Sequence, residues 1–197
     1  MLAGTFLTLC LSIAVYALAE GHAVSRATAG GACSRCGSAP LHDDLHAMLP
    51  DWAGYVQWRD VLLLGTAAAA AASVLVAGGV GRLLELATDV ADNMSWLLTV
   101  KAFTSGLTAI PSSHPSCSAA AGAPRGHCSH NMFSGHNAAA MVLLQAHLAR
   151  GGLPAMRVPM CGLLLLNACA TLCTRAHYTA DIVVAWALAS KIRSSTW

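Results

Sequence analysis

Two histidines and one aspartate have the types and spacing that group transfer requires. His177 and Asp181 are four residues apart in "TRAHYTADIVVAW", residues 174–186, and side chains at that spacing are neighbours on a helix. A carboxylate there can accept one ring N–H, fix the tautomer of the imidazole and leave the other nitrogen as a nucleophile. We therefore predict a His177–Asp181 pair in which His177 attacks an electrophile.

A second histidine, His136, stands at the start of an apolar run in "MFSGHNAAAM", residues 132–141. An ionisable group is costly there unless it is used. Two histidines and a carboxylate suit phosphoryl-type transfer: one imidazole forms a phosphohistidine, and the other protonates the leaving alkoxide and then deprotonates the acceptor. The N–H groups of a helix that starts behind Ser134-Gly135 can support the anion. The alternatives are a common Ser-Gly-His triplet without function and a His177–Asp181 bond that is only structural.

The elements that must bring these residues together are predicted to be membrane helices. Hydrophobic residues make up 56% of the chain and charged residues 10%, whereas soluble domains have about 25% charged residues. The net charge of +2 and the lack of a basic stripe argue against a nucleic-acid partner. Two uncharged segments are long enough for a bilayer span of about 20 residues, and four weaker ones follow. The six candidates are 1–19, 61–80, 94–110, 133–148, 158–173 and 178–190. We predict an all-α, polytopic membrane protein with a bundle of six transmembrane helices.

The first segment has a second interpretation. Ala17-Leu18-Ala19 resembles a signal-peptidase site, but no Lys or Arg precedes the apolar run, as a signal peptide requires. We favour a retained helix, and Glu20 lies outside the membrane in both cases.

The proposed topology puts both histidines on one face. With a cytosolic N-terminus, the segments are inside at 81–93, 149–157 and 191–197 and outside at 20–60, 111–132 and 174–177. Lys and Arg are equally numerous on the two sides but denser in the shorter inner segments, which favours this orientation. The chain between His136 and His177 has the length of two crossings, so both residues are expected on the outer face.

The cysteines of the proposed outer loops are Cys33, Cys36, Cys117 and Cys128. Structural disulfides or free thiols are favoured over a metal site, because no second Cys-x-x-Cys follows the first. We predict no metal and no soluble cofactor. The sequon at Asn93 lies on the proposed inner side and is expected to be unused.

Two segments resemble the last two signature motifs of the sphingomyelin synthase family, a membrane branch of the lipid phosphate phosphatase superfamily. They are "CSHNMFSGH", residues 128–136, and "RAHYTADIVVAW", residues 175–186. "TAIPSSHPSC", residues 108–117, and "PLHDDLHAMLP", residues 40–50, resemble earlier motifs of that family more loosely.

The resemblance implies a role for each catalytic candidate: His136 as acid and base, His177 as nucleophile and Asp181 as the orienting carboxylate. It further implies six transmembrane helices and an active site that faces the Golgi lumen or the cell exterior, in the Golgi or the plasma membrane. The expected partners are membrane lipids, with a glycerophospholipid such as phosphatidylcholine as donor and ceramide or diacylglycerol as acceptor. The expected organisation is a first helix and the start of the outer loop in 1–39, a catalytic domain in 40–190 and a short cytosolic tail in 191–197.

Three positions depart from the patterns of these families. His130 replaces a usual aspartate, His42 replaces a proline, and Thr171 occupies the position of an arginine in the phosphatases. The alternatives to a transferase are a lipid phosphate phosphatase, against which Thr171 argues, and a silent lipid-binding relative, which His130 favours. The residues expected around the substrate are Ser134, Gly135, Arg175, Tyr178, Asp43 and His130.

Overall fold

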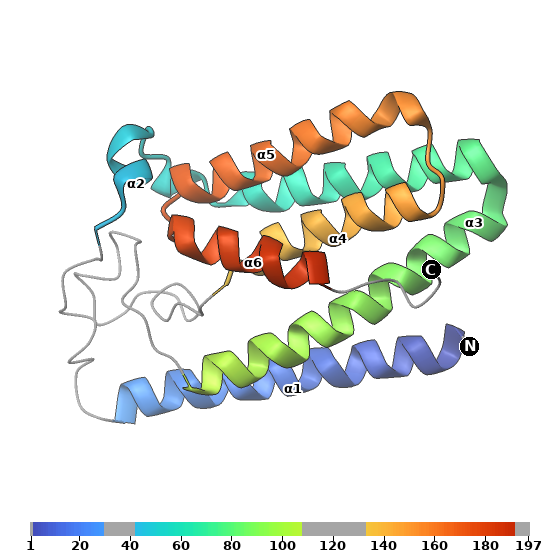
Figure 1. Ribbon diagram of the computed structural model, residues 1–197. Coiled ribbons are helices and arrows are strands. Elements are labelled where there is room, and N and C mark those ends of the chain that lie inside the picture. The colour runs from blue at the N-terminus through green and yellow to red at the C-terminus, as the bar shows by residue number, and fades with distance from the viewer. Residues whose placement is uncertain (1, 30–41, 108–132, 192–197) are drawn as a thin grey trace.

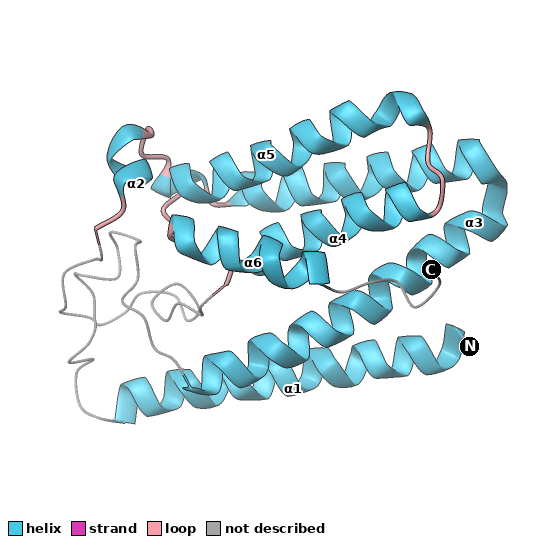
Figure 2. Ribbon diagram, viewed as in Figure 1, coloured by secondary structure: helices cyan, strands magenta, loops and turns pink. Residues whose placement is uncertain are grey.

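The computed structural model describes residues 2–29, 42–107 and 133–191. All regular structure in these ranges is helical (Figure 2), so the all-α prediction is confirmed for them. The long helices are α1 (Leu2–Ala29), α3 (Gln57–Leu107), α4 (Gly135–Ala149), α5 (Arg157–Cys173) and α6 (Thr179–Lys191). The short elements are α2 (Asp44–Met48) and the 3-10 turns η1 (Ala53–Tyr55) and η3 (Pro154–Met156).

Helix α3 consists of two helical runs that join at Gly79. This residue has φ 73° and ψ −171°, a conformation that glycine adopts easily because it has no Cβ. The chain turns back at this point, and the second run lies beside α1 (Figure 1). The segment 81–93, predicted to lie on the inner side between two spans, is helical, and its place relative to the membrane stays a prediction. The leucines, alanines and Glu85 of this segment favour helix. The chain is therefore helical on both sides of Gly79, and the turn is made at this one glycine.

Helices α4 and α5 pack against the first run of α3, and α6 packs against α4 (Figure 1). One apolar cluster joins α3, α4 and α5 through Ala70, Val74, Leu86, Ala140, Leu144, Ala146, Met160 and Leu164. A second joins the other run of α3 to α4 and α6 through Leu97, Phe133, Ala138, Val142, Ala185 and Ala189. Many of these residues are alanines, and small side chains let helices approach closely.

An ion-pair cluster fastens α4 to the second run of α3. Arg150, at the C-terminal end of α4, donates from Nη2 to Asp89 Oδ1 at 2.6 Å and from Nη1 to Glu85 Oε2 at 2.9 Å. The carbonyl oxygen of Arg150 accepts from Arg82 Nη1 at 3.1 Å. These contacts lie at the end of α4 away from His136, so they stabilise the bundle without taking part in the site.

Two helical stretches could cross a membrane, judged by their length and composition: Gln57–Thr104, which includes the turn at Gly79, and Pro154–Cys173. A shorter apolar stretch is Leu7–Leu18. Helices α4, α5 and α6 begin and end within two residues of the predicted segments, whereas α1 extends beyond residue 19 to Ala29. The arrangement of six membrane spans stays a prediction.

Candidate active site

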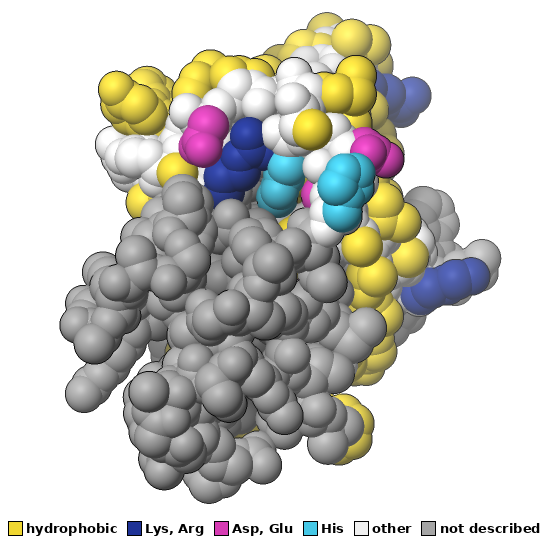
Figure 3. All heavy atoms as spheres, turned by 90° about the vertical axis from the view of Figure 1, so that its left-hand side faces the viewer, with side chains coloured by type: hydrophobic (Ala, Val, Ile, Leu, Met, Phe, Trp, Pro, Cys, Tyr) yellow, Lys and Arg dark blue, Asp and Glu magenta, His cyan; other side chains and the backbone are white. Residues whose placement is uncertain are grey.

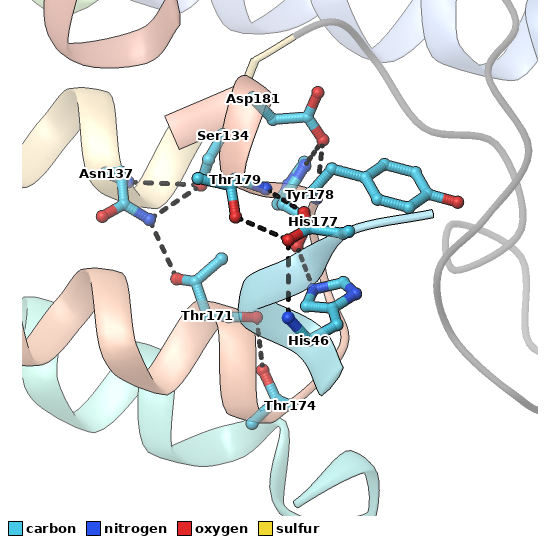
Figure 4. Close-up of polar contacts among 10 residues, drawn as sticks. His46, Ser134, Asn137, Thr171, Thr174, His177, Tyr178, Thr179 and Asp181 are labelled. Atoms are coloured by element: carbon cyan, nitrogen blue, oxygen red, sulfur yellow. Dashed lines mark hydrogen bonds and ion pairs between the residues drawn. The ribbon is translucent and has the colours of Figure 1, made fainter. Parts of the chain in front are cut away.

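The predicted contact between His177 and Asp181 is present. Nδ1 of His177, in the turn between α5 and α6, lies 3.1 Å from Oδ2 of Asp181 in the first turn of α6. The same carboxylate oxygen accepts the backbone N–H of Tyr178 at 3.1 Å (Figure 4). The side chains are 12% and 4% exposed. Asp181 is therefore held by two donors and fixes the orientation of the imidazole.

The surroundings of His177 favour its neutral form. Burial lowers the pKa of His177, the hydrogen bond to Asp181 raises it in part, and the positive charge of Lys101 lowers it further, so that the pKa lies below its usual value. An ionised Asp181 can only accept, so Nδ1 carries the ring proton and Nε2 carries the lone pair. This is the protonation state that a nucleophilic imidazole needs.

His136 has a carboxylate partner of its own. Its Nε2 lies 2.6 Å from Oδ1 of Asp60, in the first turn of α3. This pair is more open than the other, with side-chain exposures of 30% and 62%. Asp60 was not among the site residues predicted from the sequence. In the sequence, Asp60 is noticeable only as an acidic residue just before the uncharged run 61–80. Nothing in the sequence connects it to His136.

A backbone contact joins the starts of α4 and α6, and with them the two histidine motifs. The N–H of Ser134 donates to the carbonyl oxygen of Asp181 at 3.2 Å. The hydroxyl of Ser134 caps α4 by accepting from the backbone N–H of Asn137 at 3.4 Å and from its side-chain amide at 3.1 Å. Ser134 was predicted to touch substrate, and its described contacts fix the helix start that carries His136 (Figure 4).

Lys101 approaches the same helix start from the second run of α3. A Cβ built on Gly135 would lie 3.0 Å from Lys101 Nζ. The ammonium group also lies 5.1 Å from the centroid of the Tyr16 ring in α1. The N-terminus of α4 and this cation together attract an anion. Lys101 was not among the site residues predicted from the sequence, although an ionisable residue in an apolar helix is a signal of function.

Residues 127–195 match the family model described as PAP2 superfamily C-terminal. This range contains both histidine motifs and Asp181. The match supports membership of the lipid phosphate phosphatase superfamily. No curated protein and no solved structure matches the chain.

The match points to phosphatase or phosphotransferase chemistry on lipid phosphates. Together with the apolar helices, it indicates a membrane protein.

Figure 3 shows His side chains beside acidic and basic ones on the end face of the bundle. His130 lies outside the described residues. In the part of the chain that is described, no group of three or more His, Cys, Asp or Glu could hold a metal ion.

Thr171, at the position of the phosphatase arginine, belongs to a neutral network in the interior. It is fully buried, its Oγ1 accepts from Asn137 Nδ2 at 2.9 Å, and it donates to the carbonyl oxygen of Asn167 at 2.7 Å. A cation for a phosphate would have to come from elsewhere. Lys101 beside Gly135 is one described candidate, and Arg59, whose charge acts on both His136 and His177, is another.

Arg175 and Asp43 were predicted to contact substrate, and their described contacts join two segments of the protein. Nη2 of Arg175 donates to the carbonyl oxygen of Leu49 at 3.2 Å. Asp43 accepts from the backbone N–H of Thr179 at 2.6 Å and from its hydroxyl at 2.8 Å. Burial raises the pKa of Asp43, but the bonds to Thr179 and the neighbouring His46 outweigh it, so the pKa lies below its usual value.

Tyr178, the remaining predicted contact, is 5% exposed. Its ring stacks on that of His46, with 5.7 Å between centroids and 29° between planes. A role at the substrate stays a prediction for Tyr178, Arg175 and Asp43.

Proposed function

We propose that the protein is a membrane lipid phosphotransferase. It moves phosphocholine, or a related phospho-head group, from a glycerophospholipid to ceramide and releases diacylglycerol, through a phosphohistidine intermediate. The observation that carries the proposal is the His177–Asp181 pair, with its contact of 3.1 Å, beside a second histidine on the adjoining helix start. The choice of choline and ceramide rests on the resemblance to the sphingomyelin synthase family.

In the first half-reaction, Nε2 of His177 attacks the phosphorus of the donor. The bond between phosphorus and the glycerol oxygen breaks, and protonated His136 gives its proton to the departing alkoxide, which leaves as diacylglycerol. Asp181 stabilises the positive charge that forms on the His177 ring. Asp60, 2.6 Å from His136, stabilises the protonated form of His136 that this step consumes.

In the second half-reaction, the ceramide hydroxyl gives its proton to His136 while its oxygen attacks the same phosphorus. The phosphorus–nitrogen bond breaks, and its electron pair returns to Nε2 of His177. His136 is again protonated, so the cycle closes without any other reactant. Lys101 and the first N–H groups of α4 hold the non-bridging phosphate oxygens in both steps.

The site is proposed to face the lumen or the exterior, in the Golgi or the plasma membrane. Both lipid substrates are then presented in the outer leaflet. This placement rests on the resemblance and on the higher density of Lys and Arg in the inner segments.

The test supplies the full-length protein in liposomes with phosphatidylcholine labelled in its head group, with and without ceramide. The proposal expects labelled sphingomyelin only when ceramide is present, with an equal amount of diacylglycerol. His177→Ala in matched liposomes is the negative control. Parallel assays use labelled phosphatidylethanolamine and phosphatidylinositol, and transfer from one of them alone identifies a different head group. Label in no product from any of the three donors overturns the transferase proposal.

A lipid phosphate phosphatase is the second candidate, in which water replaces ceramide as acceptor. The observation that favours it is the exposure of His136 and Asp60, 30% and 62% for their side chains, because water can reach this pair. Release of inorganic phosphate from phosphatidic acid in the same liposomes, without transfer to ceramide, would establish this activity instead.

A further inference from the structure

Residues 43–52 form a strap that lies across the turn between α5 and α6. Its first residue, Asp43, binds Thr179 through both carboxylate oxygens. At its other end, the N–H of Trp52 donates to the carbonyl oxygen of Cys173 at 2.7 Å. The strap is thus fixed on both sides of the turn that contains His177.

The turn needs such support because its own backbone is unusual. Arg175 has φ 54°, in the left-handed region that residues other than glycine seldom adopt. Such a conformation persists only where surrounding contacts determine it. The guanidinium of Arg175 reaches the strap at Leu49 O, 3.2 Å away, and at Asp51 Oδ2, 3.8 Å away.

His46, in the middle of the strap, contacts the nucleophile's own peptide unit. Its Nε2 lies 2.9 Å from the carbonyl oxygen of His177, and its ring stacks on Tyr178, the next residue. A carbonyl oxygen can only accept, so Nε2 of His46 is the donor. One contact thus fixes the carbonyl group of His177, and the other packs against the side chain of the next residue (Figure 4).

We propose that His46 is a positioning residue for His177: its hydrogen bond to the His177 carbonyl oxygen sets the backbone from which the imidazole reaches Asp181. This proposal rests on the proposed function, in which His177 is the nucleophile. The contact between Nδ1 and Asp181 is 3.1 Å, so a small rotation of the His177 peptide separates the two groups. A displacement of about 1 Å at a reacting group can cost on the order of 100-fold in rate.

Two substitutions separate the two contacts of His46. His46→Phe keeps a ring against Tyr178 and removes the donor, whereas His46→Gln keeps an N–H donor and removes the ring. The matched control is His42→Phe, because the His42 side chain is 84% exposed and has Asp44 as its described neighbour. All variants are made in the full chain and reconstituted in phosphatidylcholine liposomes.

The first measurement does not require turnover. Diethyl pyrocarbonate modifies unprotonated imidazole, and peptide mass spectrometry gives the extent of modification of His177 at each pH. The bond to Asp181 stabilises the protonated ring, so His46→Phe should move the midpoint for His177 to lower pH. His46→Gln and His42→Phe should keep the midpoint of the parent. Modification of His136 in the same samples shows whether the fold is intact.

The second measurement is transfer from labelled phosphatidylcholine to ceramide. For His46→Phe we expect kcat to fall roughly ten- to a hundredfold with KM unchanged, because the nucleophile is displaced but lipid binding is not. His46→Gln should recover most of the rate.

An unchanged His177 midpoint in His46→Phe overturns the positioning role, whatever the rates are. Recovery in His46→Phe with loss in His46→Gln also overturns it, since the stack and not the hydrogen bond would then matter. A shifted midpoint in a protein that transfers no head group leaves His46 in its role and defeats the proposed function instead.

Discussion

The two histidine–carboxylate pairs differ in how they are built. His177 and Asp181 are four residues apart, and their side chains are 12% and 4% exposed. His136 and Asp60 are 76 residues apart, and their side chains are 30% and 62% exposed. The first pair is local and shielded, as a covalent nucleophile with a fixed tautomer requires. The second is assembled from two helices and open to solvent, as suits a group that exchanges protons.

The largest expected effect is at the shielded pair. His177→Ala should remove both the phosphohistidine and all transfer, because it deletes the attacking nitrogen. Asp181→Asn keeps the shape but presents a misplaced donor to Nδ1, so transfer should fall on the order of 10³- to 10⁴-fold. The measurement is initial rates of head-group transfer in liposomes, together with acid-labile label on the protein. A fall of less than tenfold in Asp181→Asn would show that this carboxylate does not orient the nucleophile.

The next effect separates the roles of the two histidines. His136→Ala should not turn over phosphatidylcholine, since the leaving alkoxide stays unprotonated. A nitrophenyl ester of phosphocholine has a leaving group that needs no proton, so the same variant should still form labelled phosphohistidine from it. Peptide mapping of the label provides the check. Label on His136 in the parent protein would reverse the two assignments.

The contact between His177 and Asp181 could be predicted because the two residues are only four apart in the sequence. Its geometry differs from the prediction: His177 lies in the turn before α6, and Asp181 in the first turn of that helix reaches back to it. The boundaries of α4, α5 and α6 were close for a similar reason: Ser134 is a helix cap, and the turns at 150–154 and 174–178 carry Gly, Pro and polar residues. These signals act over a few residues and do not depend on the rest of the fold.

The contact between His136 and Asp60 could not be predicted, because it depends on how α3 packs against α4. The same holds for Lys101, which reaches Gly135 only because Gly79 turns the second run of α3 back along the bundle. The strap is a third case: Asp43 was noticed as part of a motif, but its partner Thr179 follows from tertiary structure. Contacts between residues close in the sequence could thus be predicted, whereas contacts that depend on the packing of distant helices could not.

The charge of Lys101 acts on both His136 and His177. Its substitution should lower the transfer rate less than Asp181→Asn does and more than Asp60→Asn does. Lys101→Met keeps much of the side-chain volume and removes the cation beside Gly135, so we expect kcat/KM to fall roughly ten- to a hundredfold, which corresponds to the loss of one charged hydrogen bond. Lys191→Met, an exposed lysine at the last residue of α6, is the matched control and should retain the parent rate. Equal rates in the two variants would remove Lys101 from the phosphate site.

The smallest expected effect is at the open pair's carboxylate. Asp60→Asn removes the charge that stabilises protonated His136 but keeps an acceptor oxygen at the same position, so the ring can still be oriented. Ion pairs open to solvent contribute about 0.2 to 1 kcal/mol, and the Asp60 side chain is 62% exposed. Transfer should therefore fall by less than about tenfold, whereas the corresponding change at Asp181 should lower the transfer rate by a factor at least a hundred times larger.

Asp44→Asn is the matched control, because Asp44 is an exposed acid on α2 whose described partner is His42. The measurement is the ratio of transfer rates for Asp60→Asn and Asp181→Asn in the same liposomes. A ratio near one would mean that the proton-exchanging histidine needs its carboxylate as much as the nucleophile does, and that solvent exposure does not distinguish the two pairs.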